Sequence, residues 1–233
     1  DELLYLASGV FPDWTYDATG AFGYTIELRP TGSPGFELPP DEIRPTAEEN
    51  FQGILEMMEW AGVPITVESL AALRPAFSKD GTITAGNSSQ ISDGASAVIV
   101  TSRAHADENG WPVLAVLGSA GQVAGPDNTL HAQPARAILA ACEREGIAAA
   151  DLDFVEINEA FGAVVARSQA ELGLPDDVVN IHGGGIAIGH PIGASGNRLV
   201  VHAVHELLHR GSGTAAVALC GGGGQGDALI LKR

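Results

Sequence analysis

Apolar and polar positions follow two different periods along this 233-residue chain, and the two periods predict strands and helices. Residues 24–29 alternate apolar and polar as a strand does, and residues 46–61 carry an apolar stripe at helical spacing. Thr46 and Glu49 fit a capping box at the start of that helix, and Gly62 fits its end. The first 62 residues are therefore predicted to hold one strand, a turn-rich stretch and one helix.

From residue 63 onward, strands and helices alternate along the chain. We expect strands at 95–101, 112–118, 154–157, 214–220 and 227–232, and helices at 133–145, at 159–172 and from 196 to about 209. Glycine-rich stretches follow His182 and Cys220. Because strands that alternate with helices build layered folds, we predict an α/β fold.

Charge and composition exclude several classes of protein. A net charge of −17 argues against a nucleic-acid partner, and no apolar run reaches the roughly 18 residues of a membrane span. The two cysteines, Cys142 and Cys220, make no disulfide framework, which favours a reducing, cytoplasmic location. The chain opens at Asp1 without Met or the start of a signal peptide, so we expect a processed or truncated chain.

Three side chains with catalytic chemistry stand at the ends of predicted elements. Asn158 and Cys220 follow strands, and His190 lies in a glycine-rich loop before a helix. Strand ends are where α/β folds collect catalytic groups. A histidine can take a proton near neutral pH, an asparagine amide can donate to an oxyanion, and a cysteine can exchange a proton. We therefore expect these three side chains to meet in one site.

The sequence around these residues resembles the C-terminal half of thiolases. The matching motifs are Arg74-Pro75-Ala76-Phe77, Thr84-Ala85-Gly86-Asn87-Ser88-Ser89, Asn158-Glu159-Ala160-Phe161, His182-Gly183-Gly184-Gly185, Gly189-His190-Pro191-Ile192-Gly193-Ala194-Ser195-Gly196 and Cys220-Gly221-Gly222-Gly223-Gly224-Gln225-Gly226. The resemblance covers about residues 63–233 and implies a thiolase-type layered α/β C-terminal domain. It also implies an acyltransferase that makes or cleaves 3-ketoacyl thioesters of coenzyme A.

The resemblance assigns a role to each site residue. It implies that His190 activates the nucleophilic cysteine, that Asn158 holds a water completing the oxyanion hole, and that Cys220 is the acid/base for the second substrate. The residues implied to line the pantetheine path of coenzyme A are Ser89, Ala76, Phe77 and Phe161. The small residue usual after that serine is replaced here by Gln90. Coenzyme A thioesters are then substrates, no cofactor is permanently bound, and homo-oligomers are typical of the family.

Thiolases carry the acyl-accepting cysteine in their N-terminal half, and no such loop is found in this sequence. Cys142 sits between Ala141 and Glu143 in a predicted helix, so we interpret it as structural. Without a nucleophile no acyl-enzyme forms, so we expect the isolated chain to be inactive and to need a thiolase N-terminal half. A non-catalytic subunit with the thiolase fold that binds coenzyme A stays open as an alternative.

Residues 1–61 instead resemble the C-terminal end of a zinc metallocarboxypeptidase. Pieces that match include Tyr5, Asp13-Trp14, the strand 24–29, Gly35-Phe36 and Ile43-Arg44-Pro45. The resemblance implies that Glu27 is the general base and that Tyr5 covers the substrate, and it opens peptide hydrolysis as an alternative function. This segment contains no histidine, so we expect no zinc site in it.

We therefore divide the chain into a carboxypeptidase fragment, 1–62, and a thiolase C-terminal domain, 63–233. The first segment carries 12 acidic and 2 basic side chains, whereas the much longer second segment carries 17 and 10. Each segment lacks an essential upstream part, so a genomic rearrangement, an assembly join or an incomplete gene model explains the fusion better than a natural enzyme with two activities.

Three histidines on the last predicted helix form a second candidate cluster. His202, His205 and His209 recur at spacings that place them on one face, and such spacing can bind a metal. This face lies opposite the apolar stripe of the helix, so we expect solvent-facing side chains and no metal site.

Overall fold

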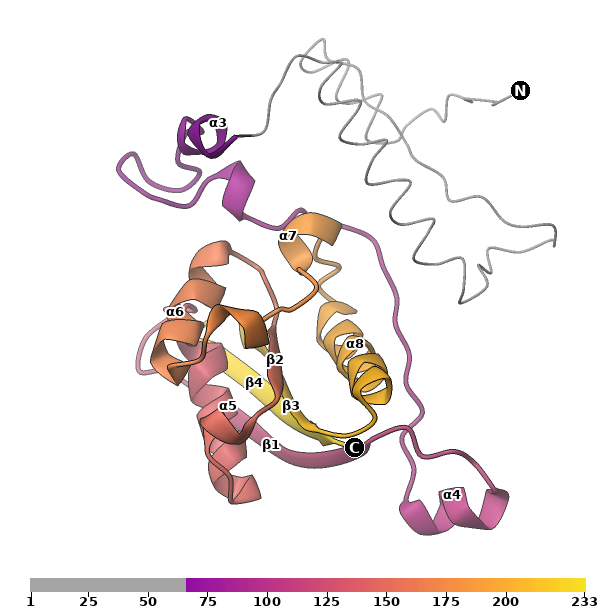
Figure 1. Cartoon of the computed structure of the whole chain (residues 1–233). Coiled ribbons are helices and arrows are strands. Elements are labelled where there is room, and N and C mark those ends of the chain that lie inside the picture. Colours follow the sequence, from indigo (N-terminus) through magenta and orange to yellow (C-terminus); the bar gives the residue numbers. More distant parts are fainter. Residues whose placement is uncertain (1–65) are drawn as a thin grey trace, which may run out of the picture. The chain divides into compact units, whose positions relative to one another are not determined.

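The computed structural model describes residues 66–233 (Figure 1). The chain divides into two compact units, Asp1–Ala71 and Ala72–Arg233. The described part of the first unit is a short helix, α3 (Val67–Ala71), at whose start Ser69 N donates to the hydroxyl of Thr66. The predicted strand 24–29, the predicted helix 46–61 and the proposed domain boundary at residue 62 lie outside the described residues.

A four-stranded mixed sheet is the centre of the second unit. Its strands are β1 (Val116–Ala124), β2 (Phe154–Ile157), β3 (Thr214–Gly221) and β4 (Gln225–Lys232), in the order β1-β4-β3-β2. β2 pairs with β3 in parallel, and β4 pairs antiparallel with both β3 and β1. Because β2 and β3 are parallel, their carboxyl ends lie at the same edge of the sheet.

Helices cover both faces of this sheet (Figure 1). On one face, α5 (Gln133–Glu145) and α6 (Gly162–Leu172) share a core with Val155 and Ile157 of β2. On the other face, α8 (Ser195–Arg210) packs against Phe154 of β2. The alternation along β2 thus sends odd and even positions into two separate cores, and it confirms the predicted layered α/β fold class.

Small residues allow α5 to approach the sheet closely. A Cβ atom on Gly121 of β1 would lie 1.9 Å from the carbonyl oxygen of Ala137, so a glycine is needed at this crossing. Ala137 and Ala141 of the helix are fully buried at the same place. The helix ends at Gly146, whose φ of 76° is the left-handed conformation that favours glycine at a helix terminus.

The structure confirms several predicted elements and shifts others. The helix 133–145 and the strand 154–157 have the predicted bounds. The helix predicted from residue 159 begins only at Gly162, because Asn158–Phe161 forms a loop after β2. The strand predicted at 112–118 is β1, displaced toward the C-terminus. The shorter elements are η1 (Ala85–Asn87), α4 (Arg103–Asn109), η2 (Ala149–Asp151), η3 (Asp176–Val178) and α7 (Gly185–Ile188).

The predicted strand 95–101 is wrong. This stretch has no regular secondary structure, and Ile99 is 91% exposed. Its apolar sequence suits a buried strand, but a strand needs a neighbour to pair its backbone groups. No strand within residues 66–233 pairs with it.

Within residues 66–233, no helix is long and apolar enough to cross a lipid bilayer.

Candidate active site

Asn158 and His190 meet at the carboxyl end of β2. Asn158 directly follows the strand and is buried, and its backbone N–H continues the sheet by donating to the carbonyl of Ala218. Its side-chain Nδ2 lies 3.3 Å from Nε2 of the His190 ring. The predicted convergence of these two residues, 32 positions apart in the sequence, is therefore present in the structure.

The second ring nitrogen of His190 contacts a buried serine. Nδ1 lies 2.6 Å from Oγ of Ser195, and that hydroxyl in turn donates to the carbonyl of Pro191 at 3.0 Å. A serine hydroxyl has a single hydrogen, so this bond makes its oxygen the acceptor from a protonated Nδ1. The unprotonated nitrogen is then Nε2, which faces Asn158. The contacts therefore favour the tautomer in which Nε2 can accept a proton.

The surroundings of His190 also favour its neutral form. Partial burial lowers the pKa of the ring below its usual value, and the positive charge of Arg198 lowers it further. A neutral imidazole is the form that can act as a general base near neutral pH.

The glycine-rich loop holds His190 through backbone contacts. Gly189 has a φ of +83°, and a Cβ there would lie 1.9 Å from Oγ of Ser92, so a larger residue does not fit. The Arg198 guanidinium donates to the carbonyl of Gly189 at 3.0 Å. The N–H of His190 donates to the carbonyl of Gln90 at 2.8 Å. Gln90, the residue that departs from the family pattern, contributes its backbone carbonyl. This contact does not depend on the side chain at position 90.

Glu159 and Asn180 tie the neighbouring loop to the end of β2. Asn180 has a φ of 49°, accepts from Ile157 N at 2.7 Å and donates to Ile157 O at 2.9 Å. It also donates to the Glu159 carboxylate, which accepts from the N–H of Ile186 at the start of α7. These contacts order the chain segment that leads into His190. Sequence reasoning missed Glu159, Asn180 and Ser195 as positioning residues, although two of them lie inside the quoted motifs.

Cys220 lies at the end of β3, beside the strand that leads into Asn158. The parallel register pairs Ile157 with Ala218, which places Cys220 two residues further along. Burial raises the pKa of its thiol, so the side chain is protonated at neutral pH and can donate a proton. The separation between the His190 ring and the Cys220 sulfur, expected to be within about 7 Å, stays a prediction.

Three of the four residues assigned to the pantetheine path lie together. The rings of Phe77 and Phe161 meet edge to face, with centroids 5.6 Å apart. Ser89 donates from both its backbone N–H and its hydroxyl to the carbonyl of Ala160, the residue before Phe161. Ala76 precedes Phe77 and donates from its backbone to Ile83. The role of these residues in binding coenzyme A stays a prediction.

The remaining predicted residues lie apart from this site. Tyr5 and Glu27 lie outside the described residues. Cys142 belongs to α5 and points into the core, where burial raises the pKa of its thiol. Within residues 66–233 no group of three or more metal-binding side chains is arranged to hold a metal ion.

One expectation for the histidine face of α8 is wrong. His205 and His209 are exposed as expected, but His202 points back toward the sheet and contacts Glu156 of β2. The His202 ring turns inward because it contacts the buried carboxylate of Glu156. The sequence pattern of α8 describes one helix and therefore does not reveal a partner on another element.

Comparison with known proteins identifies the family. The family model described as "Thiolase, C-terminal domain" matches residues 111–233, and "Thiolase, N-terminal domain" matches residues 40–104. A third model, "Zinc carboxypeptidase", matches residues 1–53. The thiolase and carboxypeptidase matches overlap at residues 40–53, so the division of the chain at residue 62 stays a prediction.

Proteins of other organisms are similar to this chain over part of their length. A probable acetyl-CoA acetyltransferase of Mycolicibacterium smegmatis is 57% identical over 83% of this chain and 50% of its own length. The human peroxisomal 3-ketoacyl-CoA thiolase is 44% identical over 72% of this chain and 40% of its own length. The crystal structure of human mitochondrial 3-ketoacyl-CoA thiolase in complex with CoA superimposes with a TM-score of 0.70 at 40% identity, covering 73% of this chain and 43% of that one.

The fold is a layered α/β domain in which an asparagine and a histidine are in contact at a strand end. The C-terminal domain match spans more than half of the residues, and the chain belongs to the thiolase family. It spans about half the length of the curated relatives it matches.

Proposed function

We propose that this chain supplies the histidine, asparagine and second cysteine of a thiolase that makes or cleaves 3-ketoacyl thioesters of coenzyme A. The observation that carries the proposal is the chain of contacts Asn158–His190–Ser195, which leaves Nε2 of His190 as the basic nitrogen. The side-chain amide oxygen of Asn158, Oδ1, is buried and has no hydrogen-bond partner among residues 66–233. A buried open acceptor of this kind suits the proposed holding of a water.

In this proposal His190 starts the reaction as a base. Nε2 takes the proton of a cysteine thiol, and the thiolate attacks the thioester or ketone carbonyl of the substrate. The oxygen gains negative charge and is stabilised by the protonated His190 and by the water held at Asn158. In cleavage, the protonated Cys220 thiol gives its proton to the leaving acetyl-CoA carbanion. The resulting Cys220 thiolate takes the proton of coenzyme A, whose sulfur attacks the acyl-enzyme and releases the nucleophilic cysteine, and synthesis runs through the same steps in reverse.

We infer that the nucleophilic cysteine lies outside these 233 residues, in a thiolase N-terminal half. Residues 40–104, which match the thiolase N-terminal domain, contain no cysteine. Cys142 is buried and has a raised pKa, so it is a poor nucleophile. The exposed apolar residues Ile91 and Ile99 support a missing partner, because a thiolase N-terminal half would cover them. We place the assembled enzyme in the cytoplasm, in agreement with two free thiols.

Complementation tests this proposal. The chain is purified alone and after co-expression with the N-terminal half of the Mycolicibacterium smegmatis relative, and acetoacetyl-CoA cleavage by coenzyme A is measured. We expect no turnover by the chain alone and turnover by the pair. The matched variant His190→Ala should lower the rate of the pair by at least about 100-fold. An active isolated chain, or a pair that assembles but stays inactive, would overturn the proposal.

Two alternatives give different outcomes in the same samples. A non-catalytic coenzyme A-binding subunit would bind coenzyme A in the assembled pair without turnover. Zinc carboxypeptidase activity is favoured by the match to residues 1–53, but this segment contains no histidine to ligate zinc. We therefore expect metal analysis after dialysis to find no zinc bound stoichiometrically to the chain.

A further inference from the structure

A buried carboxylate lies next to the proposed site and has no part in its chemistry. Glu156 is in β2 and is 2% exposed. It is two residues before Asn158, near the carboxyl end of β2. A buried carboxylate needs a partner of opposite charge or a hydrogen-bond donor. The partner of Glu156 therefore bears on the end of β2 from which Asn158 projects.

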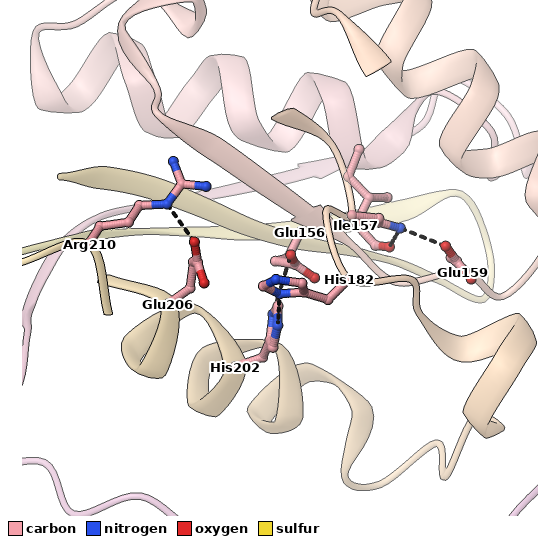
Figure 2. A network of polar contacts seen from close by, with 8 residues as sticks. Glu156, Ile157, Glu159, His182, His202, Glu206 and Arg210 are labelled. Carbon is pink, nitrogen blue, oxygen red and sulfur yellow. Dashed lines mark hydrogen bonds and ion pairs between the residues drawn. The ribbon is translucent and has the colours of Figure 1, made fainter. Parts of the chain in front are cut away.

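The partner is His202 of α8. Its Nδ1 lies 3.3 Å from Oε1 of Glu156, although the ring N–H does not point straight at the oxygen, so the pair is in ionic contact without a linear hydrogen bond. Its other nitrogen, Nε2, lies 3.0 Å from Nδ1 of His182, and the two rings stand at 90° to each other. Figure 2 shows Glu156 of the sheet, His182 of the loop and His202 of α8 gathered in one cluster.

His182 connects this cluster to the segment that carries His190. It lies two residues after Asn180, whose side chain is fixed to Ile157, and it precedes the glycines that lead into α7 and Gly189. His182 is exposed, His202 is half-buried and Glu156 is buried. The three side chains therefore form a continuous path from solvent to the face of β2 beneath the site.

The number of protons on His202 decides how strongly it contacts Glu156 and His182. A doubly protonated His202 faces the Glu156 carboxylate with Nδ1–H and donates Nε2–H to the lone pair of His182 Nδ1, a charge-assisted hydrogen bond. A neutral His202 has one proton for these two contacts, and its ionic attraction to the buried Glu156 is lost. Uptake of one proton thus strengthens both contacts.

The other charges around His202 act in the same direction. Contact with Glu156 raises the pKa of His202 above its usual value against the opposing effect of burial, and the charge of Glu206 raises it further. Glu206 is itself paired with Arg210 at 2.6 Å and lies near the ionisable rings of His182 and His209. Figure 2 shows the Glu206–Arg210 pair one turn along α8 from His202.

We propose that Glu156, His202 and His182 form a positioning relay that fastens the loop before His190 to β2 and α8, and that protonation of His202 tightens this relay. The relay does not touch substrate. It rests on the proposed function only in assigning His190 the role of base. The arrangement couples the position of His190 to a proton taken up at a separate place on the surface.

The pH dependence has a defined sign. Because the folded pKa of His202 is raised, the folded state holds the extra proton in a pH range where the unfolded state has lost it. The stabilisation is fully present below the usual histidine pKa of about 6.5 and is lost as the pH rises through the raised value. The loop is therefore fastened below the usual histidine pKa and loosened as the pH rises through the raised pKa of His202.

Titration of the full-length chain by NMR tests the relay without any thiolase reaction. The ring signals of His202 and His190 are followed with pH in the wild type and in His202→Gln, Glu156→Gln, His182→Asn and His205→Gln. His205 is an exposed histidine on the same helix, so His205→Gln is the matched control. In the wild type we expect the His190 signals to show their own step and a second step at the pKa of His202.

The variants separate a relay from an isolated ion pair. His202→Gln should remove the second step, whereas His205→Gln should keep it. His182→Asn should leave the pKa of His202 raised but reduce the second His190 step by at least about half. Glu156→Gln should lower the pKa of His202, because the contact with Glu156 is the main cause that raises it.

Several results would overturn the relay. One is a wild-type His190 that shows no second step, and another is an unchanged step in His182→Asn. If His202→Gln does not fold, His182→Asn still decides the matter, since it changes an exposed loop residue. Failure of the complementation experiment would contradict the proposed function and would leave these titrations unaffected.

Discussion

At the scale of single residues, the properties of His190 depend on a serine that takes no part in the reaction. Ser195 is fully buried, and its oxygen lies between the His190 ring and the Pro191 carbonyl. We predict that Ser195→Ala destabilises the fold by about 1–3 kcal/mol, because it leaves a partly buried ring nitrogen without its partner. It should also increase the tautomer of His190 protonated at Nε2, which the 15N chemical shifts of the ring report.

Ser168→Ala is the matched control for this prediction. Ser168 is equally buried, and its hydroxyl donates to the His131 carbonyl at 2.8 Å, away from His190. Its loss should cost a similar free energy of unfolding and should leave the His190 tautomer unchanged. Equal tautomer populations in the wild type and Ser195→Ala would contradict the positioning role of Ser195.

The sequence revealed the residues of the site better than their partners. Asn158 and His190 could be predicted to meet because a strand end and a glycine-rich loop each present one polar side chain there. The contact of His202 with Glu156 could not be predicted, because the helical pattern describes one helix and the carboxylate belongs to a strand. A charged residue inside a four-residue buried strand was the available signal, since such a group needs a partner.

At the scale of elements, the Glu145 carboxylate joins α5 to β4 by an ion pair and to β1 by a hydrogen bond. The Glu145 carboxylate contacts Lys232 of β4 and accepts from the N–H of Ser119 in β1 at 2.6 Å. Lys232 first, and then Ser119, lower the pKa of Glu145 to about 2. Because Lys232 is partly exposed and the pair is screened by solvent, we predict that Glu145→Gln costs only about 1 kcal/mol of unfolding free energy at pH 7.

The sign of the pH dependence follows from the lowered pKa. The stabilisation is present above the usual glutamate pKa of about 4.5 and is lost as the pH falls toward 2. Denaturant unfolding of the wild type and Glu145→Gln should therefore differ at pH 7 and converge toward pH 2. Exposed Glu143→Gln, two positions away on α5, is the control and should behave as the wild type. A constant difference at all pH values would contradict this prediction.

Elements whose partners lie among residues 66–233 could be predicted, and the stretch 95–101, which has no strand partner there, could not. The helix 133–145 and the strand 154–157 bury apolar side chains in the same core, so pattern and structure agree. The stretch 95–101 has an equally apolar pattern but no neighbouring strand among residues 66–233. Periodicity reports the environment for which a segment is suited, and here most of that segment faces solvent in the chain alone.

At the scale of the whole molecule, the exposed stretch 95–101 allows the stability of the isolated chain to be tested separately from its association with a thiolase N-terminal half. Ile99 is 91% exposed, so Ile99→Asp removes little buried surface. We predict that the unfolding free energy of the isolated chain changes by less than about 0.5 kcal/mol. A carboxylate at this position would become buried without a partner if the thiolase N-terminal half covers it, and such burial is strongly unfavourable.

The same substitution should therefore act only on the assembled pair. We expect Ile99→Asp to weaken association with the N-terminal half by at least about tenfold, measured by sedimentation, and to lower acetoacetyl-CoA cleavage in proportion at limiting concentrations. Ile99→Val keeps the apolar character at this position and should associate like the wild type. Unchanged association of Ile99→Asp would show that the N-terminal half binds elsewhere, and a large loss of stability in the isolated chain would show that the exposed stretch belongs to its own fold.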